Sequence, residues 1–510
     1  MIKYFKGTLA LIIVALTPVK AQESVSNGPM SAIDWLSDTV VVPPSSGLGS
    51  EGLIGDSVTT EAIETAPLET LAIDGVGLLP SRVTGLPPDF WGPTSAKDLV
   101  TLIGDLRLDL PGPARELFFQ ILLAELDPPV DAGPDHALFL ARIDALLRFG
   151  ALEQAQALLE RAGPTDASLF RRWFDVSLLS GNEDRACAVM RAAPDVAPTF
   201  SARVFCLARG NDWSAAALSL DTARALGVLS EEDDILLARF LDPELFEGQP
   251  MAPLPSPLTP LSYRMLVALG EAPSTTTLPI AFAHAALEPV TGWKARLEAA
   301  ERLVRTGGLA PTQLFALYTE RRAAASGGLW ERVSSVQAVD AALLGGDDEA
   351  LWEALPRAAR ELDGGRLFEA FAQHYGPRLA ERPVPKTQAQ LRDRAVLLSS
   401  AAETAAPSVK DPYLAAIAQG LPPVGGPDDA LHSAIASAFQ PSGGAVSDTF
   451  EALIAQGRLG ETVLRSLALL NAINPDPGDV EAALSILRRL GFESSARATA
   501  LSLLLANGEE

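Results

Sequence analysis

The chain has 510 residues, of which 48% are hydrophobic and only 6% are aromatic, and it contains two Cys. This composition indicates an aliphatic chain built mainly from Leu and Ala. Its 40 basic and 64 acidic side chains leave a formal net charge of -24 at pH 7, which excludes nucleic acid or an anionic membrane surface as the main partner.

Residues 1–21 have the pattern of a cleavable secretory signal. Lys3 and Lys6 precede an apolar run at residues 9–16, and small residues stand at the -3 and -1 positions of a cleavage site after Ala21. The run is too short for a stable membrane-spanning helix, and an uncleaved anchor is the alternative. We therefore expect an exported protein of the Gram-negative periplasm that has no integral membrane segment after signal cleavage.

Residues 22–94 differ in composition from the rest of the chain. They contain many Asp and Glu residues but only one basic residue, Arg82, and scattered Gly and Pro interrupt any helical period. This predicts an acidic, largely disordered tail. Trp35 and Trp91 are candidate docking residues in it, because an aromatic side chain buries a large area at a small cost in entropy. The alternative is that they pack on the protein's own folded body.

From Thr94 onward the sequence predicts helices. Apolar residues recur at 3.6-residue spacing in segments of about 10 to 16 residues, separated by Gly, Pro, Asp or Asn. Short helices joined by short turns are antiparallel neighbours, so we expect an all-α chain that stacks into an α-solenoid. A Pro-rich spacer at residues 242–260 divides it into helical regions 95–241 and 261–510.

Two segments of the first helical region share a repeated spacing. Gly150 is followed by the small residue Ala155, and Gly181 is followed at the same distance by Ala186, with matching apolar positions after each. Over residues 138–198 this pattern resembles the tetratricopeptide repeat, in which paired helices stack into a superhelix.

The resemblance implies a concave groove lined by the first helix of each pair. Arg148, Arg171 and Arg172 fall near groove-facing positions of that register, where Arg binds a carboxylate through two hydrogen bonds. Such a groove accepts an acidic peptide or a chain terminus, the protein's own acidic tail included. The alternative is that these Arg side chains are solvated on exposed faces. The repeat pattern is imperfect at Arg142, where the family has a large aliphatic residue.

The two Cys residues flank one predicted turn. If residues 183–193 and 200–208 form an antiparallel helix pair, Cys187 and Cys206 lie equally far from the turn and face each other. In an oxidising compartment we expect a disulfide, which stabilises the fold by about 3 kcal/mol in the chain-entropy model. The alternative is two buried free thiols.

No catalytic motif is found, and we expect no metal and no cofactor. The four His stand alone, and the glycine spacing of residues 47–52 lacks the strand and helix that a dinucleotide site requires. Glu493 and Ser494 resemble the catalytic start of soluble lytic transglycosylases, whose downstream Gly-Leu-Met-Gln element is missing here.

These observations favour a non-enzymatic periplasmic scaffold or adaptor that binds a protein or peptide partner in the envelope. The alternative is a cell-wall-associated factor that binds peptidoglycan or another glycan, with a degenerate lytic-enzyme-like superhelix. Arg and Asn side chains in a groove favour the first function. Exposed aromatic side chains in a groove favour the second.

Overall fold

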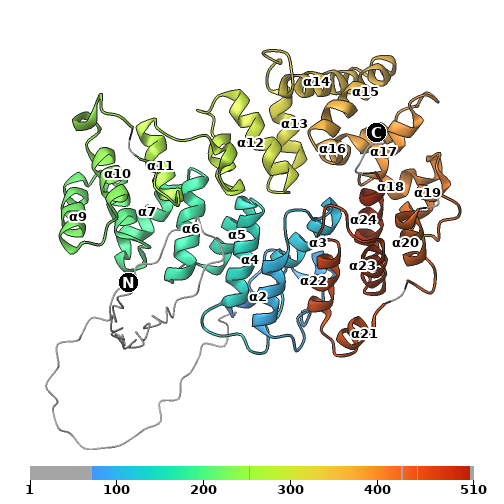
Figure 1. Cartoon of the computed structure of the whole chain (residues 1–510), viewed down its shortest axis with the longest axis horizontal. Helices are drawn as coiled ribbons and strands as arrows, with labels where there is room; N and C mark the ends of the chain where they lie inside the picture. Colours follow the sequence, from blue (N-terminus) through green and yellow to red (C-terminus); the bar gives the residue numbers. More distant parts are fainter. Residues whose placement is uncertain (1–71, 165, 252, 427–428, 445, 506–510) are drawn as a thin grey trace, which may run out of the picture. The chain divides into compact units, whose positions relative to one another are not determined.

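The computed structural model describes residues 72–505, apart from residues 165, 252, 427–428 and 445. The predicted signal at residues 1–21, the first part of the predicted tail and Trp35 lie outside this described part. Every regular element in the described part is a helix, and the described residues contain no strand (Figure 1). A single isolated bridge joins Leu79 to Ala124. The predicted all-α class is therefore confirmed.

The α-helices follow one another along the chain with short connections. The first twelve are α1 (Ser81–Thr84), α2 (Ala96–Asp105), α3 (Gly112–Leu123), α4 (Ala137–Arg148), α5 (Leu152–Ala162), α6 (Ala167–Leu179), α7 (Glu183–Ala192), α8 (Phe200–Arg209), α9 (Trp213–Leu226), α10 (Glu231–Leu241), α11 (Pro260–Leu269) and α12 (Trp293–Arg305). The others are α13 (Pro311–Thr319), α14 (Leu329–Gly345), α15 (Asp348–Gly364), α16 (Phe368–Ala380), α17 (Ala389–Leu397), α18 (Ala402–Ala405), α19 (Pro412–Ala418), α20 (Ala430–Ala438), α21 (Asp448–Ala455), α22 (Leu459–Leu469), α23 (Pro477–Arg489) and α24 (Glu493–Leu505). Short 3-10 helices lie between them: η1 (Ile73–Gly75), η2 (Pro194–Val196), η3 (Pro243–Phe246), η4 (Thr275–Thr277), η5 (Ile280–Leu287) and η6 (Ala406–Ser408).

Polar caps and glycine turns set the helix ends. The side chains of Ser95, Asp166 and Thr199 each accept a backbone N–H from the first turn of the helix that follows, which satisfies a donor that the helix itself leaves free. Gly150 and Gly181 have φ of 77° and 70°. This left-handed conformation favours Gly, and it turns the chain back between α4 and α5 and between α6 and α7.

Consecutive helices pack against each other, as in the pairs α4 and α5, α8 and α9, and α14 and α15. Two hydrophobic clusters result. One contains residues from Val76 to Phe282 and again from Leu397 to Leu501, and the other contains residues from Ala283 to Leu398. The first cluster includes Leu residues on both sides of residues 242–260, so the predicted spacer does not separate two cores.

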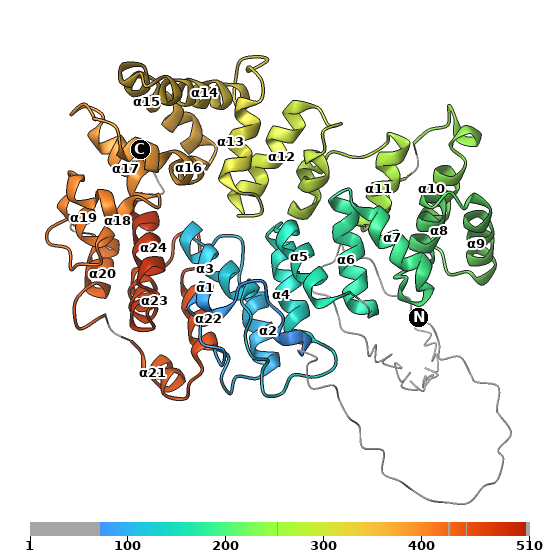
Figure 2. The ribbon, with the colours of Figure 1, turned by 180° about the vertical axis from the view of Figure 1, so that it is seen from behind.

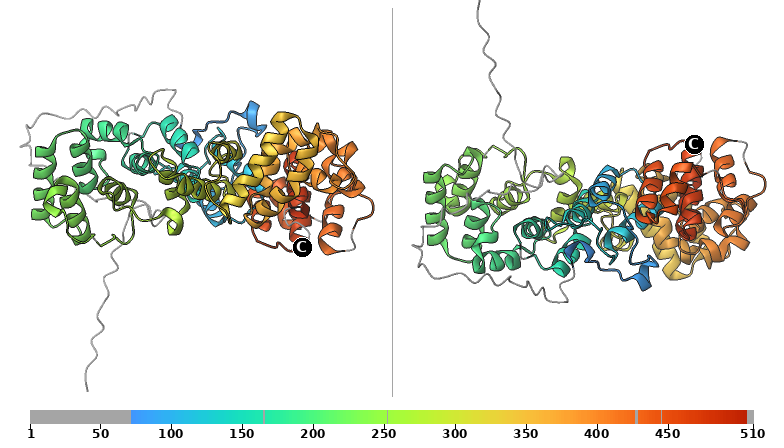
Figure 3. Two further views of the ribbon diagram at one scale, coloured as in Figure 1. Left: turned by 90° about the horizontal axis from the view of Figure 1, so that it is seen from above. Right: turned by 90° about the horizontal axis from the view of Figure 1, so that it is seen from below.

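The last helices of the described part return to the first ones. Helix α24 packs on α3, and α22 packs on α2 and α3, so α22 and α24 lie beside α2 and α3 in the two ribbon views (Figures 1 and 2) and in the views from above and below (Figure 3). In a simple stack of repeats each unit contacts only its neighbours. This packing therefore adds long-range contacts that helix periodicity does not predict.

The folded body begins earlier than the predicted boundary at residue 95. Residues 72–94 contain η1 and α1, and the side chains of Phe90 and Trp91 are 1% and 2% exposed. Trp91 packs on Gly460 at the start of α22, where a Cβ would come within 2.4 Å of its ring. The backbone N–H of Gly460 donates to the carbonyl of Phe90 at 2.8 Å. Trp91 is thus an interior residue and is not presented to a partner.

Arg142 holds the same segment in place. Its guanidinium is 1% exposed and donates four hydrogen bonds of 2.8–3.2 Å to backbone carbonyls, those of Asp74, Val76, Leu122 and Ala124. Burial lowers its pKa to about 10, and the charge of Asp74 partly offsets that effect. A charged side chain at a core position of α4 is therefore explained by the segment that it anchors.

Cys187 in α7 and Cys206 in α8 lie within disulfide-bonding distance, with their Cα atoms 4.9 Å apart. The two helices pack against each other, as predicted. Both Cys side chains are buried in the first hydrophobic cluster. The described residues include no helix with both the length and the apolar character needed to cross a bilayer.

Candidate functional site

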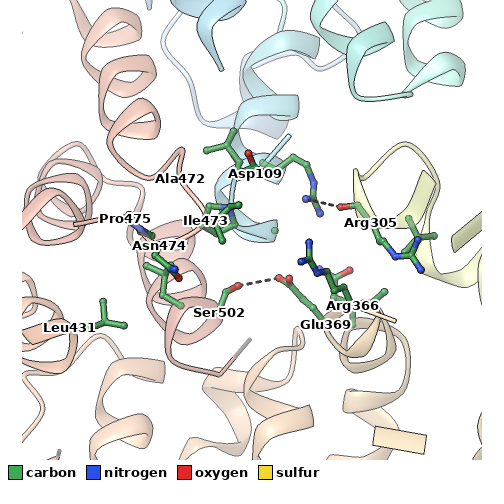
Figure 4. A pocket seen from close by; sticks show the side chains of 18 of the residues that line it. Asp109, Arg305, Arg366, Glu369, Leu431, Ala472, Ile473, Asn474, Pro475 and Ser502 are labelled. Carbon is green, nitrogen blue, oxygen red and sulfur yellow. Dashed lines mark hydrogen bonds between the residues drawn. The ribbon is translucent and has the colours of Figure 1, made fainter. Parts of the chain in front are cut away.

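A cavity of about 340 Å³ lies where the helices at the two ends of the described chain meet (Figure 4). Its walls come from the start of α3, the end of α12, the start of α16, the connection between α22 and α23, and the end of α24. Its lining residues are Asp109, Leu110, Pro111, Gly112, Arg115, Val304, Arg305, Arg366, Glu369, Ala370, Gln373, Leu431, Ala472, Ile473, Asn474, Pro475, Pro477, Ser502 and Leu503. Pockets of this size accept small molecules or a few residues of a peptide.

The start of α3 lies against the Glu369 side chain of α16. Gly112 begins α3 directly after Pro111, and a Cβ on Gly112 would come within 2.2 Å of the Glu369 Oε1 atom. A residue with a Cβ at position 112 would require the end of the Glu369 side chain to move. The Oγ of Ser502, from the end of α24, donates to the same oxygen at 3.4 Å. Glu369 is therefore held at the junction of three helices.

Arg366 has an unusual backbone. It follows Gly364 and Gly365, yet it is the Arg that has the left-handed conformation, with φ of 54°. This conformation costs a residue with a Cβ about 1 kcal/mol, and such outliers concentrate at functional sites. The Arg366 side chain is exposed, and within the described part of the chain it makes no hydrogen bond or ion pair. Figure 4 shows it beside Glu369 on one side of the cavity.

Arg115 is the second cavity guanidinium. Its Nη1 donates to the carbonyl of Arg305 at 3.2 Å, and among the described residues no carboxylate lies within ion-pair distance of it. Burial lowers the pKa of Arg115, and the charges of Glu369 and Glu116 partly offset this. A guanidinium has five N–H donors, so most of the donors of Arg115 have no protein acceptor.

Glu369 has the opposite electrostatic environment. Burial raises the pKa of its carboxyl group, the positive charge of Arg115 lowers it in part, and the charge of Glu116 raises it further. The carboxyl group therefore binds a proton more readily than an ordinary Glu. The cavity holds its positive and negative groups close together without a direct ion pair between Arg115 and Glu369.

The opposite wall is the connection between α22 and α23. Ile473 and Asn474 lie there, across the cavity from Arg366 and Glu369 in Figure 4, and the Ile473 side chain is 79% exposed. The side chain of Asn471 accepts the backbone N–H of Arg107 at 3.2 Å, which fastens this connection to the segment before α3. The wall therefore presents an amide group and an apolar side chain on a connection that is tied to the body.

The predicted groove arginines lie elsewhere and are engaged within the protein. Arg148 donates to the carbonyls of Ile103 and Gly104 at 2.8 and 2.6 Å. Arg172 forms two hydrogen bonds with the carboxylate of Asp144, at 2.6 and 2.8 Å. The Arg171 side chain is buried, at 8% exposed. The three side chains do not line the cavity.

The cavity residues Arg115, Arg366 and Glu369 were not singled out from the sequence. The one local signal is the sequence Gly364-Gly365-Arg366, a turn in which the residue after the glycines is an Arg. A glycine turn of this kind is common between helices, so it does not by itself indicate a site. The cavity exists because distant helices meet, and no local pattern reports that contact.

The lining residues determine which chemical groups the cavity presents. Its residues in the described chain include two guanidinium groups without a carboxylate partner, two carboxyl groups, two amides, a hydroxyl and aliphatic side chains, and none is His, Cys or aromatic. In the residues that the structure describes, no three His, Cys, Asp or Glu side chains gather closely enough to hold a metal ion. No protein-family model, curated protein or solved structure matches this chain.

Proposed function

We propose that this protein is an exported, non-enzymatic scaffold of the periplasm that binds a protein or peptide partner. In this proposal the helices form a degenerate α-solenoid of the tetratricopeptide-like kind. The many consecutive helix pairs and the left-handed turns at Gly150 and Gly181 support that architecture. The packing of α24 on α3 forms part of the cavity wall.

The composition of the cavity carries the proposal. Arg115, Arg366 and Asn474 provide donors for a peptide's carboxylate and carbonyl groups, while Glu369 provides an acceptor for its N–H groups. Glycan-binding sites rely on aromatic side chains that stack on sugar rings, and none of the described lining residues is aromatic. The cavity therefore favours a peptide partner over the alternative of a glycan of the cell wall.

Site-specific photo-crosslinking tests this function. The photoreactive residue p-benzoylphenylalanine is placed at the position of Ile473, which is 79% exposed and lines the cavity, in the full chain expressed in its native cell envelope. The matched control carries it at Val130, which is 82% exposed and away from the cavity. We expect a covalent adduct with one protein partner at position 473 and none at position 130.

The adducts are identified by mass spectrometry after protease or muramidase treatment. An adduct that muramidase removes and protease leaves intact would assign the cavity to a glycan and would contradict the proposal. Equal adducts at positions 473 and 130 would show that the cavity plays no part in partner binding.

A further inference from the structure

We infer that the cavity binds the free C-terminal carboxylate of a peptide whose last side chain is apolar. This inference rests on the proposed function and names the chemical class of its ligand. Three features of the cavity lead to it: guanidinium groups without carboxylate partners, a small net charge of the lining, and an apolar wall.

The guanidinium groups define the anionic end of the ligand. Arg115 and Arg366 reach the cavity from α3 and from the turn before α16, and neither forms an ion pair with any described residue. Arg binds a carboxylate through two parallel hydrogen bonds, and such charge-assisted bonds are about twice as strong as neutral ones. Most other guanidinium groups that line helix junctions here bind a carboxylate or several carbonyls, as Arg172 and Arg142 do. The cavity lacks that internal acceptor, and a ligand carboxylate supplies it.

The acidic lining residues limit the charge of the ligand. Asp109 and Glu369 line the same cavity as Arg115, Arg305 and Arg366, and Arg305 is already paired with Glu301 at 2.9 Å. The positive charges of Arg115 and Arg366 therefore nearly balance the negative charges of Asp109 and Glu369. A ligand with one negative charge fits this lining better than a phosphate dianion. Glu369 and the Asn474 amide are then placed to bind the N–H and C=O groups of the ligand's last peptide unit.

The apolar wall defines the side chain next to that carboxylate. Leu110, Val304 and Leu503 line the cavity from the connection before α3, from α12 and from α24, and the exposed Ile473 completes the wall. Burial of one aliphatic side chain contributes about 1.5–3 kcal/mol. A cavity of about 340 Å³ has room for one such residue together with its terminal carboxylate.

Isothermal titration calorimetry on the purified full-length mature protein tests the inference. The probes are the tripeptide Ala-Ala-Leu with a free carboxylate, the same tripeptide with a C-terminal amide, free leucine, and inorganic phosphate. We expect the free-carboxylate peptide to bind about tenfold more tightly than its amide, because the amide loses the charge-assisted bonds. Leucine lacks the preceding peptide unit and is expected to bind more weakly than the tripeptide.

The variant Arg366→Gly connects binding to the cavity. Glycine suits the left-handed backbone of this position, so the variant is expected to fold, and its melting temperature and circular dichroism verify this. We expect about a tenfold loss of affinity for the free-carboxylate peptide and no change for its amide. Arg322→Gly is the matched control, because Arg322 is exposed, lies outside the cavity and has no side-chain partner among the described residues. It should bind like the wild type.

Four results would overturn the inference. These are equal affinity for the peptide and its amide, unchanged affinity in Arg366→Gly, binding of phosphate alone, and binding of leucine as tight as that of the tripeptide. The last result would assign the carboxylate to a free amino acid instead of a chain terminus. This test can fail while the proposed function holds. If a protein partner still crosslinks at position 473 in Arg366→Gly, the inference is wrong and the scaffold function is retained.

Discussion

Arginines in two regions of this protein differ in whether the protein itself supplies acceptors for their guanidinium groups. Around α4 and α6, Arg142, Arg148 and Arg172 are the anchored arginines, whose guanidinium groups bind carbonyls or a carboxylate of the protein itself. At the junction of α3, α16 and α24, Arg115 and Arg366 are the cavity arginines, which have no carboxylate partner among the described residues.

The difference follows from what surrounds each guanidinium. The anchored arginines lie between neighbouring elements that present carbonyl or carboxylate oxygens at hydrogen-bonding distance, so their donors are satisfied within the fold. The cavity arginines lie between helices that are far apart in the sequence, whose junction leaves a space and offers Arg115 one carbonyl. The charge of the side chain is the same in both groups of arginines. What distinguishes the groups is the number of protein acceptors around each guanidinium.

The largest effect is expected for the anchored Arg142. In Arg142→Ala, four buried carbonyls lose their donor, and the segment that begins the folded body loses its attachment. We expect the free energy of unfolding to fall by about 4 kcal/mol, as measured by urea unfolding. The exposed Arg322→Ala is the control and should change it by less than about 0.5 kcal/mol. A loss below about 1 kcal/mol for Arg142→Ala would mean that water replaces the guanidinium and that the anchoring role is wrong.

A direct comparison of one arginine from each region is expected to give a smaller effect. Arg172→Ala removes the two bonds to Asp144, in a pair whose side chains are 6% and 15% exposed, so the free energy of unfolding should fall by about 2 kcal/mol. Arg366→Gly removes no internal bond. Relief of its left-handed backbone and the greater freedom of glycine in the unfolded chain nearly cancel, so we expect a change within about 1 kcal/mol of zero.

The same urea series measures both variants. If both variants lost the same free energy of unfolding, Arg366 would be a structural residue, and the distinction between anchored and cavity arginines would be wrong. Retention of wild-type stability by Arg172→Ala would show that the pair with Asp144 contributes specificity of packing and little free energy.

Local features of the fold could be predicted from the sequence. The helical period and the turns at Gly150 and Gly181 depend on residues close together in the chain, and the structure has both. The proximity of the two Cys residues could also be predicted, because it depends on one turn between two consecutive helices.

The remaining features depend on partners far away in the sequence. Residues 72–94 lack a helical period, and they fold because Arg142 and Gly460 supply contacts that composition does not reveal. The groove prediction did not include the internal partners of its arginines. Arg172 donates to Asp144, and Arg148 donates to carbonyls of α2. The cavity needs α24 against α3, a contact across nearly the whole described chain, and a single sequence offers no signal for it.

The smallest expected effect is a dependence of ligand binding on pH, and it sharpens the assignment of the cavity arginines. Burial raises the pKa of Glu369 above its ordinary value of 4.5, and Arg115, Glu116 and Ser502 are the groups that act on it directly. Below the raised pKa the carboxyl group is neutral and still accepts the ligand's N–H through its carbonyl oxygen, and above it a negative charge faces the ligand's own carboxylate. We therefore expect affinity for Ala-Ala-Leu to fall by about threefold as pH rises through the raised pKa of Glu369.

Isothermal titration calorimetry at pH values below and above the raised pKa of Glu369, with the wild type and Glu369→Gln, measures this change in affinity. The ligand carboxyl group ionises near pH 3.5, below the range, so it stays charged throughout. Gln cannot ionise and keeps the shape of the side chain, so the variant should bind with a pH-independent affinity close to that of the wild type at low pH. A wild-type affinity that rises with pH, or the same pH dependence in Glu369→Gln, would place the titrating group elsewhere and remove Glu369 from the neighbourhood of the bound carboxylate.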